Sequence, residues 1–455
     1  MNSINQLLSE LIPYAEWLML IFVIGGGLWL VLYSKGLPYR YFVHAIKVVS
    51  GKYSKGDAPG EISHLQALSS AVAATVGLGN ISGVAIAIYH GGPGVVFWMW
   101  LTAIIGMCIK FYSCSLAVMF RKKLPDGQVL GGPMYYITLG LGPKFKPMAV
   151  FFCLAGLFGV LPVFTVNQFT QTLIRVVNPA ETILPLSDFN WKFIIGITLV
   201  ILTSLVIFGG LKKIAKVATS IVPFMVLLYF ISVLIMMSLN SSSILPSLQL
   251  ILNEAFNFNT AVQGGFWGLV ILGVRRAVFS NESGVGTAPM FHGQSRTHEP
   301  VREGLVAMLG PFIDTIVVCT LTALVIIISG VYTNADNNGI LMTLAAFEKL
   351  LFGYGAEILM ILVSAFALST LFTYSYYGVK CLTFITNARV GKWYNAVYIL
   401  SITFAAVATV DMVTNLIDLS FAFMCLPNMI AVIWLAPHIN RAATTYFKKM
   451  KHEKA

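Results

Sequence analysis

A helix-weakening stretch lies inside an apolar run that is long enough to cross a bilayer. The run extends from about Leu65 to Tyr89, and residues 74–83 within it read ATVGLGNISG. Its glycines and its Asn weaken a helix at the depth where freed backbone N–H and C=O groups have no water to bond. Irregular backbone is tolerated there only where protein buries it or where it lines a polar cavity. The stretch therefore predicts a cavity at mid-membrane depth.

A second stretch of the same character lies in the second half of the chain. Residues 280–286 read SNESGVG within another apolar segment, and the break that they predict lies between Gly273 and Gly286. Interrupted apolar segments at corresponding places in two halves of a chain are the best sequence indication of a secondary transporter's binding site. The two stretches together predict a solute carrier built around two broken helices.

Composition supports a membrane location and argues against several other classes. The 455 residues are 57% hydrophobic and 10% charged, whereas a soluble domain carries roughly 25% charged residues. The net charge of +11 does not indicate nucleic-acid binding, because the charges lie in short loops and at the C-terminal end. The six cysteines fall in apolar segments without metal spacing, so we interpret them as core residues. We find no nucleophile triad, phosphate loop or metal cluster, and expect neither an enzyme nor a cofactor.

The sequence predicts eleven apolar segments of spanning length. They lie near residues 12–33, 65–90, 94–120, 147–174, 193–210, 215–239, 262–289, 304–331, 355–380, 393–410 and 412–437. Basic residues are retained on the cytoplasmic side of a membrane. With the N-terminus outside, most of the 29 lysines and arginines fall on the predicted cytoplasmic side, and three, Arg175, Lys192 and Lys349, fall outside. We therefore expect a multi-pass protein of the plasma or bacterial inner membrane with a cytoplasmic C-terminus.

The predicted helices divide into one extra helix near the N-terminus and two sets of five that follow it. We interpret residues 1–455 as a single transport domain, in which the segment at 12–33 stands apart. The other ten segments fall into two sets of five, residues 65–239 and 262–437, each led by a broken segment. Because five is odd, the two sets enter the membrane from opposite sides, as in an inverted repeat. Residues 438–455 are expected to form a basic cytoplasmic tail.

Several motifs, taken in order, resemble the alanine or glycine:cation symporter family, the sodium:alanine symporters. The matching stretches extend over nearly the whole chain and lie at residues 77–85, 91–94, 97–100, 131–136, 279–289, 312–315 and 376–378. The resemblance implies an all-α leucine-transporter-like fold and cation-coupled uptake of a small neutral amino acid, alanine or glycine. The sequence departs from the family's pattern at Leu78, Ser283 and Tyr374, where Thr, Ala and Trp are usual.

The first break suits the two poles of an amino acid zwitterion. The second half of a broken helix presents free N–H groups and a positive dipole end to a carboxylate. Gly77 and Gly79 allow close approach of the backbone, and Asn80 can hydrogen-bond either pole. Close helix packing through small residues is the alternative explanation for the glycines. We favour substrate binding because Asn80 and a matching second break accompany them.

The second break carries Asn281, Glu282 and Ser283 as further candidate binding residues. A charged side chain at mid-membrane costs ~2.5–3.5 kcal/mol on insertion scales and indicates function by default. Glu282 has three candidate roles: it holds the substrate ammonium, holds a cation or carries a proton. The alternative is an internal ion pair with Arg275 or Arg276, and both explanations remain open.

Two further helices complete the predicted substrate pocket. The family resemblance places Gln168 near the amino acid, and an interhelical hydrogen bond is the alternative. Thr370 and Tyr374 are four residues apart and share one helix face. We expect Tyr374 to close the side-chain pocket and limit substrate size.

A sodium site of the leucine-transporter-like kind is predicted from oxygen ligands. Hydroxyl and carbonyl oxygens suit a hard monovalent cation. The candidates are Thr75, Gly77, Ser369, Thr370 and Thr373. Each hydroxyl alone is better explained by a bond to its own helix backbone, so only the combination supports the site.

Two other intramembrane charges, Lys110 and Asp314, have no assigned role, and the sequence names no partner for Asp314. Each is interpreted as a gate or as part of a packing ion pair. His90, His292 and His298 fall in predicted turns, where we expect them to be solvated.

The predicted function is uptake of alanine or glycine coupled to inward Na⁺ movement by alternating access. The main alternative is proton-coupled transport of another amino acid such as glutamine, with the proton on Glu282. A solute sensor without transport is a further alternative, although the chain carries no signalling domain. The partners expected are a small neutral amino acid, Na⁺ (or H⁺) and the lipid bilayer, and no nucleic acid.

Overall fold

The computed structural model describes residues 2–53, 58–125, 128–177, 188–257, 265–334, 338–351, 353–407 and 410–452. Within these residues the regular elements are helices and one antiparallel pair of strands, β1 (Lys122–Lys123) with β2 (Val129–Leu130). An isolated parallel bridge joins Ile62 to Ser295. Up to α12, the helices are α1 (Asn2–Met19), η1 (Leu20–Gly26), α2 (Gly27–Tyr33), α3 (Leu37–Arg40), α4 (Phe42–Val49), α5 (His64–Thr75), α6 (Leu78–Gly91), α7 (Val95–Met119), α8 (Pro133–Tyr135), η2 (Tyr136–Gly140), η3 (Pro143–Phe145), α9 (Lys146–Gly159), α10 (Val163–Val177), α11 (Asp188–Ile207) and α12 (Gly210–Leu239).

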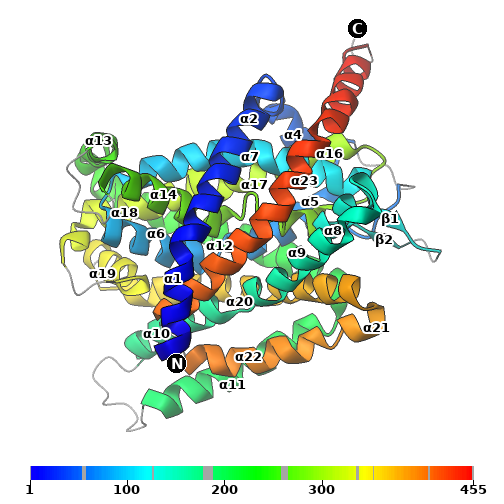
Figure 1. Ribbon diagram of the computed structural model, residues 1–455. Coiled ribbons are helices and arrows are strands. Elements are labelled where there is room, and N and C mark those ends of the chain that lie inside the picture. The colour runs from blue at the N-terminus through cyan, green and yellow to red at the C-terminus, as the bar shows by residue number, and fades with distance from the viewer. Residues whose placement is uncertain are drawn as a thin grey trace.

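The second half of the chain contributes a similar number of elements (Figure 1). They are η4 (Ser241–Ser243), α13 (Ile244–Ala255), α14 (Gly265–Asn281), α15 (Ala288–His292), α16 (Pro300–Ala307), α17 (Leu309–Pro311), η5 (Phe312–Cys319), α18 (Thr320–Ser329), η6 (Val331–Thr333), α19 (Ile340–Leu350), α20 (Gly355–Ile385), α21 (Ala388–Gly391), α22 (Tyr394–Val407) and α23 (Val410–His452).

Nine helices in the described part of the chain are long and apolar enough to cross a membrane. They correspond to nine of the eleven predicted segments. The other two, predicted at 262–289 and 393–410, contain α14 with 17 residues and α22 with 14 residues. The second break ends α14 early, and α22 stops at Val407, beside residues outside the described part.

The first predicted break separates α5 from α6. A capping box begins α5, since Ser63 Oγ accepts from the Gln66 amide at 3.2 Å and Gln66 Oε1 accepts from the Ser63 amide at 2.9 Å. The helix ends at Thr75, and Val76 and Gly77 leave helical geometry before α6 begins. In the most apolar 18 residues of this span, 94% of the residues are buried inside the protein. Protein therefore surrounds the irregular backbone, as its depth in a membrane requires.

The second break lies between Asn281 and Ala288. It begins inside the range predicted from the sequence, Gly273 to Gly286. Glu282 has φ +53°, and Gly284 and Gly286 have φ +87° and +97°. Left-handed backbone at a residue with a side chain costs about 1–3 kcal/mol and persists only where the surroundings hold it. Strain of this kind gathers at functional sites, which marks Glu282 independently of its charge.

Long helices enclose the two breaks. α12 and α20 pack against α5, while α7 packs against α14 and α16. α23 runs across the molecule beside α1 and α9, and α11 and α22 pair at one edge (Figure 1). The predicted tail at 438–455 continues α23 as far as His452. Its Phe447 ring stacks on Tyr41 with centroids 3.5 Å apart, so this part of the helix rests on the chain near α4.

Candidate substrate and cation site

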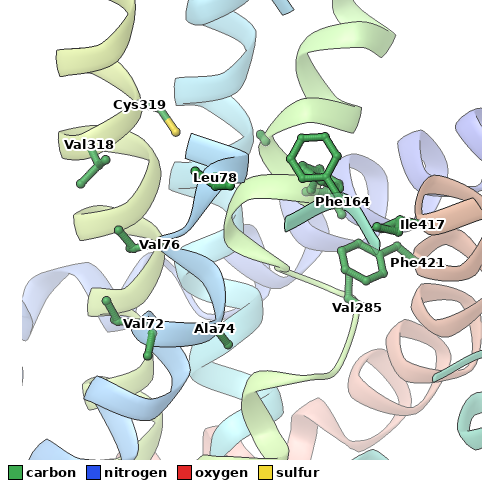
Figure 2. Close-up of a cluster of buried hydrophobic side chains, with 14 of the residues drawn as sticks. Val72, Ala74, Val76, Leu78, Phe164, Val285, Val318, Cys319, Ile417 and Phe421 are labelled. Carbon is green, nitrogen blue, oxygen red and sulfur yellow. The ribbon is translucent and has the colours of Figure 1, made fainter. Parts of the chain in front are cut away.

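A small cavity lies where the first break, α10, α14 and α20 meet. Thr75, Gly77, Gly79, Thr370 and Tyr374 line it, and all five were predicted as site residues. Its volume is about 20 Å³, which holds roughly one water. Part of the apolar wall is visible in Figure 2, where Phe164 and Ile417 lie on the side of the second unwound segment, near Val285. An amino acid therefore enters only if the lining moves apart.

An Asn side chain stabilises each break and ties it to the same π-helix, η5. Asn80 Oδ1 accepts from the Gly77 amide at 3.3 Å, and Asn80 Nδ2 donates to Asp314 Oδ1 at 2.9 Å. Asn281 Oδ1 accepts from the Ser283 amide at 2.9 Å, and its Nδ2 donates to Thr315 Oγ1 at 3.0 Å. Adjacent residues of η5 thus hold the two breaks together. A π-helix in a membrane span is itself a frequent mark of a functional site.

Asp314 is the centre of this polar network. Its Oδ1 accepts from Asn80, from Ser280 and from Thr315. Its Oδ2 is buried without a hydrogen-bond partner in the described part of the chain, as is the Thr75 hydroxyl that faces it. Lys110 on α7 also lies within electrostatic range of Asp314. The sequence marked Asp314 as an intramembrane charge, but its partners come from segments far away in the chain.

Glu282 does not pair with the arginines that precede it. Arg276 Nη2 lies 3.3 Å from Asp418 Oδ2, and Arg275 Nε lies 3.7 Å from the same oxygen. Glu282 instead accepts hydrogen bonds from Thr287 and from the Tyr374 hydroxyl. Tyr374 lines the cavity, so Glu282 acts on the pocket through this phenol.

Four oxygens gather where α20 crosses the end of α5. Ser369 Oγ and Thr370 Oγ1 lie 3.3 Å and 3.2 Å from the Ala73 carbonyl oxygen. The same hydroxyls donate to the Phe366 carbonyl of their own helix at 2.9 Å and 3.1 Å, which is the bond expected for each hydroxyl alone. Their approach to the Ala73 carbonyl on α5 is what distinguishes them. Two carbonyl and two hydroxyl oxygens at these distances form a set of ligands that suits a monovalent cation. Thr373 turns away, because its hydroxyl donates to the Ser369 carbonyl at 2.9 Å.

The remaining predicted residues lie outside the cavity lining. Gln168 Oε1 accepts from the Ser82 hydroxyl and, at 3.4 Å, from the Ile340 amide, so it joins α10 to α6 and α19. Ser283 is fully buried against α7, where a Cβ built on Gly106 would lie 2.5 Å from its hydroxyl oxygen.

A second polar cluster joins the far ends of both broken helices. Glu303 on α16 bonds His64, the first residue of α5, and His292, the last residue of α15, the latter at 2.5 Å. The expectation that His292 is solvated was wrong, since it is 1% exposed. Arg121 extends the cluster by donating to the Ser295 carbonyl at 2.8 Å. The sequence offered one unused signal, the acidic Glu303 at the start of an apolar segment.

Comparisons with known proteins agree on one family. A family model described as "Sodium:alanine symporter family" matches residues 1–455. The sodium/alanine symporter AgcS of Methanococcus maripaludis is 36% identical over 439 residues, covering 96% of this chain and 94% of that protein. The probable sodium/glutamine symporter GlnT of Bacillus subtilis is 32% identical over 455 residues, covering 98% of this chain and 92% of that protein. The structure of MhsT in complex with L-phenylalanine aligns with a TM-score of 0.56 at 15% identity, covering 85% of this chain and 98% of MhsT.

The likeness to MhsT confirms the predicted leucine-transporter-like fold. The two broken helices and the absence of any larger sheet in the described residues agree with it. The match along the full length and the relatives above 30% identity confirm the family that the motifs indicated. The chain belongs to the sodium:alanine symporter family.

Proposed function

We propose that this protein imports a small neutral amino acid, alanine or glycine, together with one Na⁺. The observation that carries the proposal is that the first break borders both the candidate substrate cavity and the candidate cation site. Gly77 borders both the cavity and the oxygen cluster, because a Cβ built on it would lie 2.5 Å from Thr370 Oγ1. A cation at Ser369 and Thr370 therefore stabilises the same unwound backbone that contacts substrate. Coupling requires that ion and substrate favour one state together.

Each pole of the zwitterion has a complementary group in the cavity wall. The first amides of α6, at Leu78 and Gly79, face the carboxylate at the positive end of that helix. The carbonyl end of α14 near Phe279 faces the ammonium. Tyr374, held by Glu282, closes the side-chain end. The aromatic wall that Phe164, Phe279 and Tyr374 form around the cavity supports a small side chain.

The cation set is the Ala73 and Phe366 carbonyls with the Ser369 and Thr370 hydroxyls. Na⁺ moving down ~100 mV gains about 2.3 kcal/mol. A tenfold concentration ratio adds about 1.4 kcal/mol. At one-to-one coupling these sustain accumulation on the order of several hundred-fold. Na⁺ is a transported substrate in this scheme, and no cofactor is needed.

We further propose the membrane arrangement expected from the charges. The N-terminus lies outside, and the basic end of α23 lies in the cytoplasm with the Glu303 cluster near that side. Residues 65–239 and 262–437 are the two inverted repeats, and the buried breaks that lead them support this division. The helix at 12–33 lies outside the repeats, against α23.

A proton-coupled glutamine carrier is the second candidate. The buried carboxylate of Glu282 and its contact with the pocket residue Tyr374 favour it. The name of the relative GlnT gives glutamine as its substrate, which supports the choice of glutamine in this candidate. The two candidates disagree on the ion and on side-chain size, so one experiment separates them.

Equilibrium binding of labelled alanine to the purified protein, in Na⁺ and in K⁺ of equal ionic strength, tests the proposal. We expect Na⁺ to tighten alanine binding, and glycine to compete better than glutamine. In Thr370→Val the Na⁺ effect is lost while weak binding in K⁺ remains, because one of the ion's two hydroxyl ligands is removed and the amides that hold the substrate are kept. Thr373→Val is the matched control, since the Thr373 hydroxyl bonds two carbonyls of its own helix, whereas the Thr370 hydroxyl also reaches the Ala73 carbonyl on α5. Equal alanine binding in both salts would contradict the proposal.

A further inference from the structure

Two buried carboxylates and one lysine form a charged group beside the second break. Glu282, Asp314 and Lys110 are 1%, 0% and 2% exposed. The nearby arginines, Arg275 and Arg276, lie against Asp418 instead. Lys110 is the buried lysine within electrostatic range of both carboxylates, and the group carries one net negative charge when all three side chains are ionised.

Close contacts at two glycines, Gly106 and Gly310, locate the Lys110 side chain. α7 touches the second break at Gly106, where a Cβ would lie 2.5 Å from Ser283 Oγ. Lys110 is one turn further along the same face of α7. A Cβ built on Gly310 would lie 3.5 Å from Lys110 Nζ, so the ammonium also lies against α17 next to η5. The lysine thus reaches from the second break to the helix that carries Asp314.

The ammonium is not half of a fixed salt bridge. It interacts with both carboxylates. Among the described residues no carboxylate oxygen lies within salt-bridge distance of it. Asp314 Oδ2 and the Thr75 hydroxyl are buried beside each other, and neither makes a hydrogen bond to any other group in the described chain. These oxygens are the kind of ligand that a hard cation takes, and the ammonium next to them supplies the charge.

We propose that Lys110 is a tethered counter-cation that takes the place of a second coupling ion and so limits transport to one Na⁺. This inference rests on the proposed Na⁺ symport. With the lysine present, its charge repels a cation from Asp314 and Glu282. Without it, the vacated space and the unpartnered oxygens accept Na⁺. Lys110 is thus a positioning residue that sets the ion stoichiometry without contacting the substrate.

Equilibrium binding of ²²Na⁺ to the purified full-length protein tests this inference through the difference between variants. We expect Lys110→Ala to bind one Na⁺ more than the wild type, and the double variant Lys110→Ala with Asp314→Asn to lose the additional ion. Lys380→Ala is the matched control, a partly buried lysine that lies over the Tyr376 ring, and it keeps the wild-type number. A structural role for Lys110 would not produce a gain of ion that Asp314→Asn removes.

Other outcomes are equally decisive. An unchanged Na⁺ number in Lys110→Ala overturns the inference, as does a double variant that keeps the additional ion. If Lys110→Ala is not monodisperse, Lys110→Gln, which keeps most of the stem, replaces it; failure of both to fold makes Lys110 a packing residue and overturns the inference. A wild type without bound Na⁺ contradicts the proposed symport, whereas the gain between variants still reports on Lys110.

Discussion

Replacing Gly77 by Ala tests whether the first break carries the coupling ion. Gly77 has φ −137° and ψ −155°, an extended conformation that alanine also adopts, so the substitution acts through the added methyl group. That Cβ would lie 2.5 Å from Thr370 Oγ1 and 3.7 Å from Thr370 Cβ. A carbon cannot approach an oxygen so closely, and the hydroxyl must rotate away from the Ala73 and Phe366 carbonyls.

The size of the effect follows from local overpacking. Added methyl groups in packed interiors cost about 1–3 kcal/mol. If the cost falls on the state that binds Na⁺, the Na⁺ concentration for half-maximal uptake rises about 5- to 150-fold. The assay is alanine uptake into proteoliposomes across a range of Na⁺ concentrations. Saturating Na⁺ restores much of the rate, because the substituted residue hinders ion binding without removing the substrate's amide donors.

Two other glycines on the same helix provide a graded control. A Cβ on Gly83 would lie 3.6 Å from the Phe279 ring, an ordinary contact, and we expect nearly wild-type Na⁺ dependence. A Cβ on Gly79 would lie 3.1 Å from that ring, which lines the cavity, so alanine affinity falls more than Na⁺ affinity. Equal Na⁺ dependence in Gly77→Ala and Gly83→Ala would refute the placement of the ion at Thr370.

Three further substitutions test other contacts. Glu282→Gln should weaken alanine affinity about tenfold, because it replaces a charge-assisted hydrogen bond from Tyr374 by a neutral one. Uptake should stay Na⁺-dependent in this variant. A switch of ion specificity would instead make Glu282 the ion carrier. Tyr374→Phe releases the ring from Glu282, and competition uptake should then show a gain for glutamine over alanine, with unchanged selectivity counting against a pocket-closing role. Glu303→Gln removes the carboxylate partner of two buried histidines, and removing one partner of a buried pair costs about 3–5 kcal/mol. Amide exchange should then rise in the helices that these histidines begin and end, α5 and α15; protection equal to the wild type would mean that the cluster does not hold the helix ends.

The positions of the two breaks were predictable because their cause is local. Glycines and polar side chains in apolar runs weaken a helix wherever the chain folds. The first break begins at Val76, within the predicted stretch, and the second begins at Glu282. The cavity residues Gly77 and Gly79 were found for the same reason, whereas Thr370 and Tyr374 were found from their four-residue spacing on one helix and from the family resemblance.

What holds the breaks was not predictable, because it depends on contacts between distant segments. Asn80 meets Asp314 and Asn281 meets Thr315 across many residues of chain. An isolated charge such as Asp314 signals function but not its partner. The same limit applied to Glu282, for which the adjacent arginines were a plausible partner by sequence alone and Tyr374 is the partner in the fold.

The pairing of two histidines with one carboxylate was missed for a related reason. His64 and His292 lie at predicted loop edges, where histidine is usually solvated. The return of the chain through residues 59–62 and 294–297 buries them, since the Glu61 amide donates to the Gln294 carbonyl at 2.8 Å and a parallel bridge joins Ile62 to Ser295. Neither segment has a hydrophobic periodicity from which so short a backbone pairing could be predicted.

Uptake of labelled alanine into proteoliposomes, driven by one gradient at a time, tests the central claim most directly. One set of vesicles has an inward Na⁺ gradient with the pH gradient collapsed, and the other has an inward H⁺ gradient without Na⁺. Na⁺ symport predicts accumulation in the first set, loss of that accumulation in Thr370→Val, and no accumulation in the second set. Accumulation driven by H⁺ alone would contradict the account and place the coupling ion on Glu282.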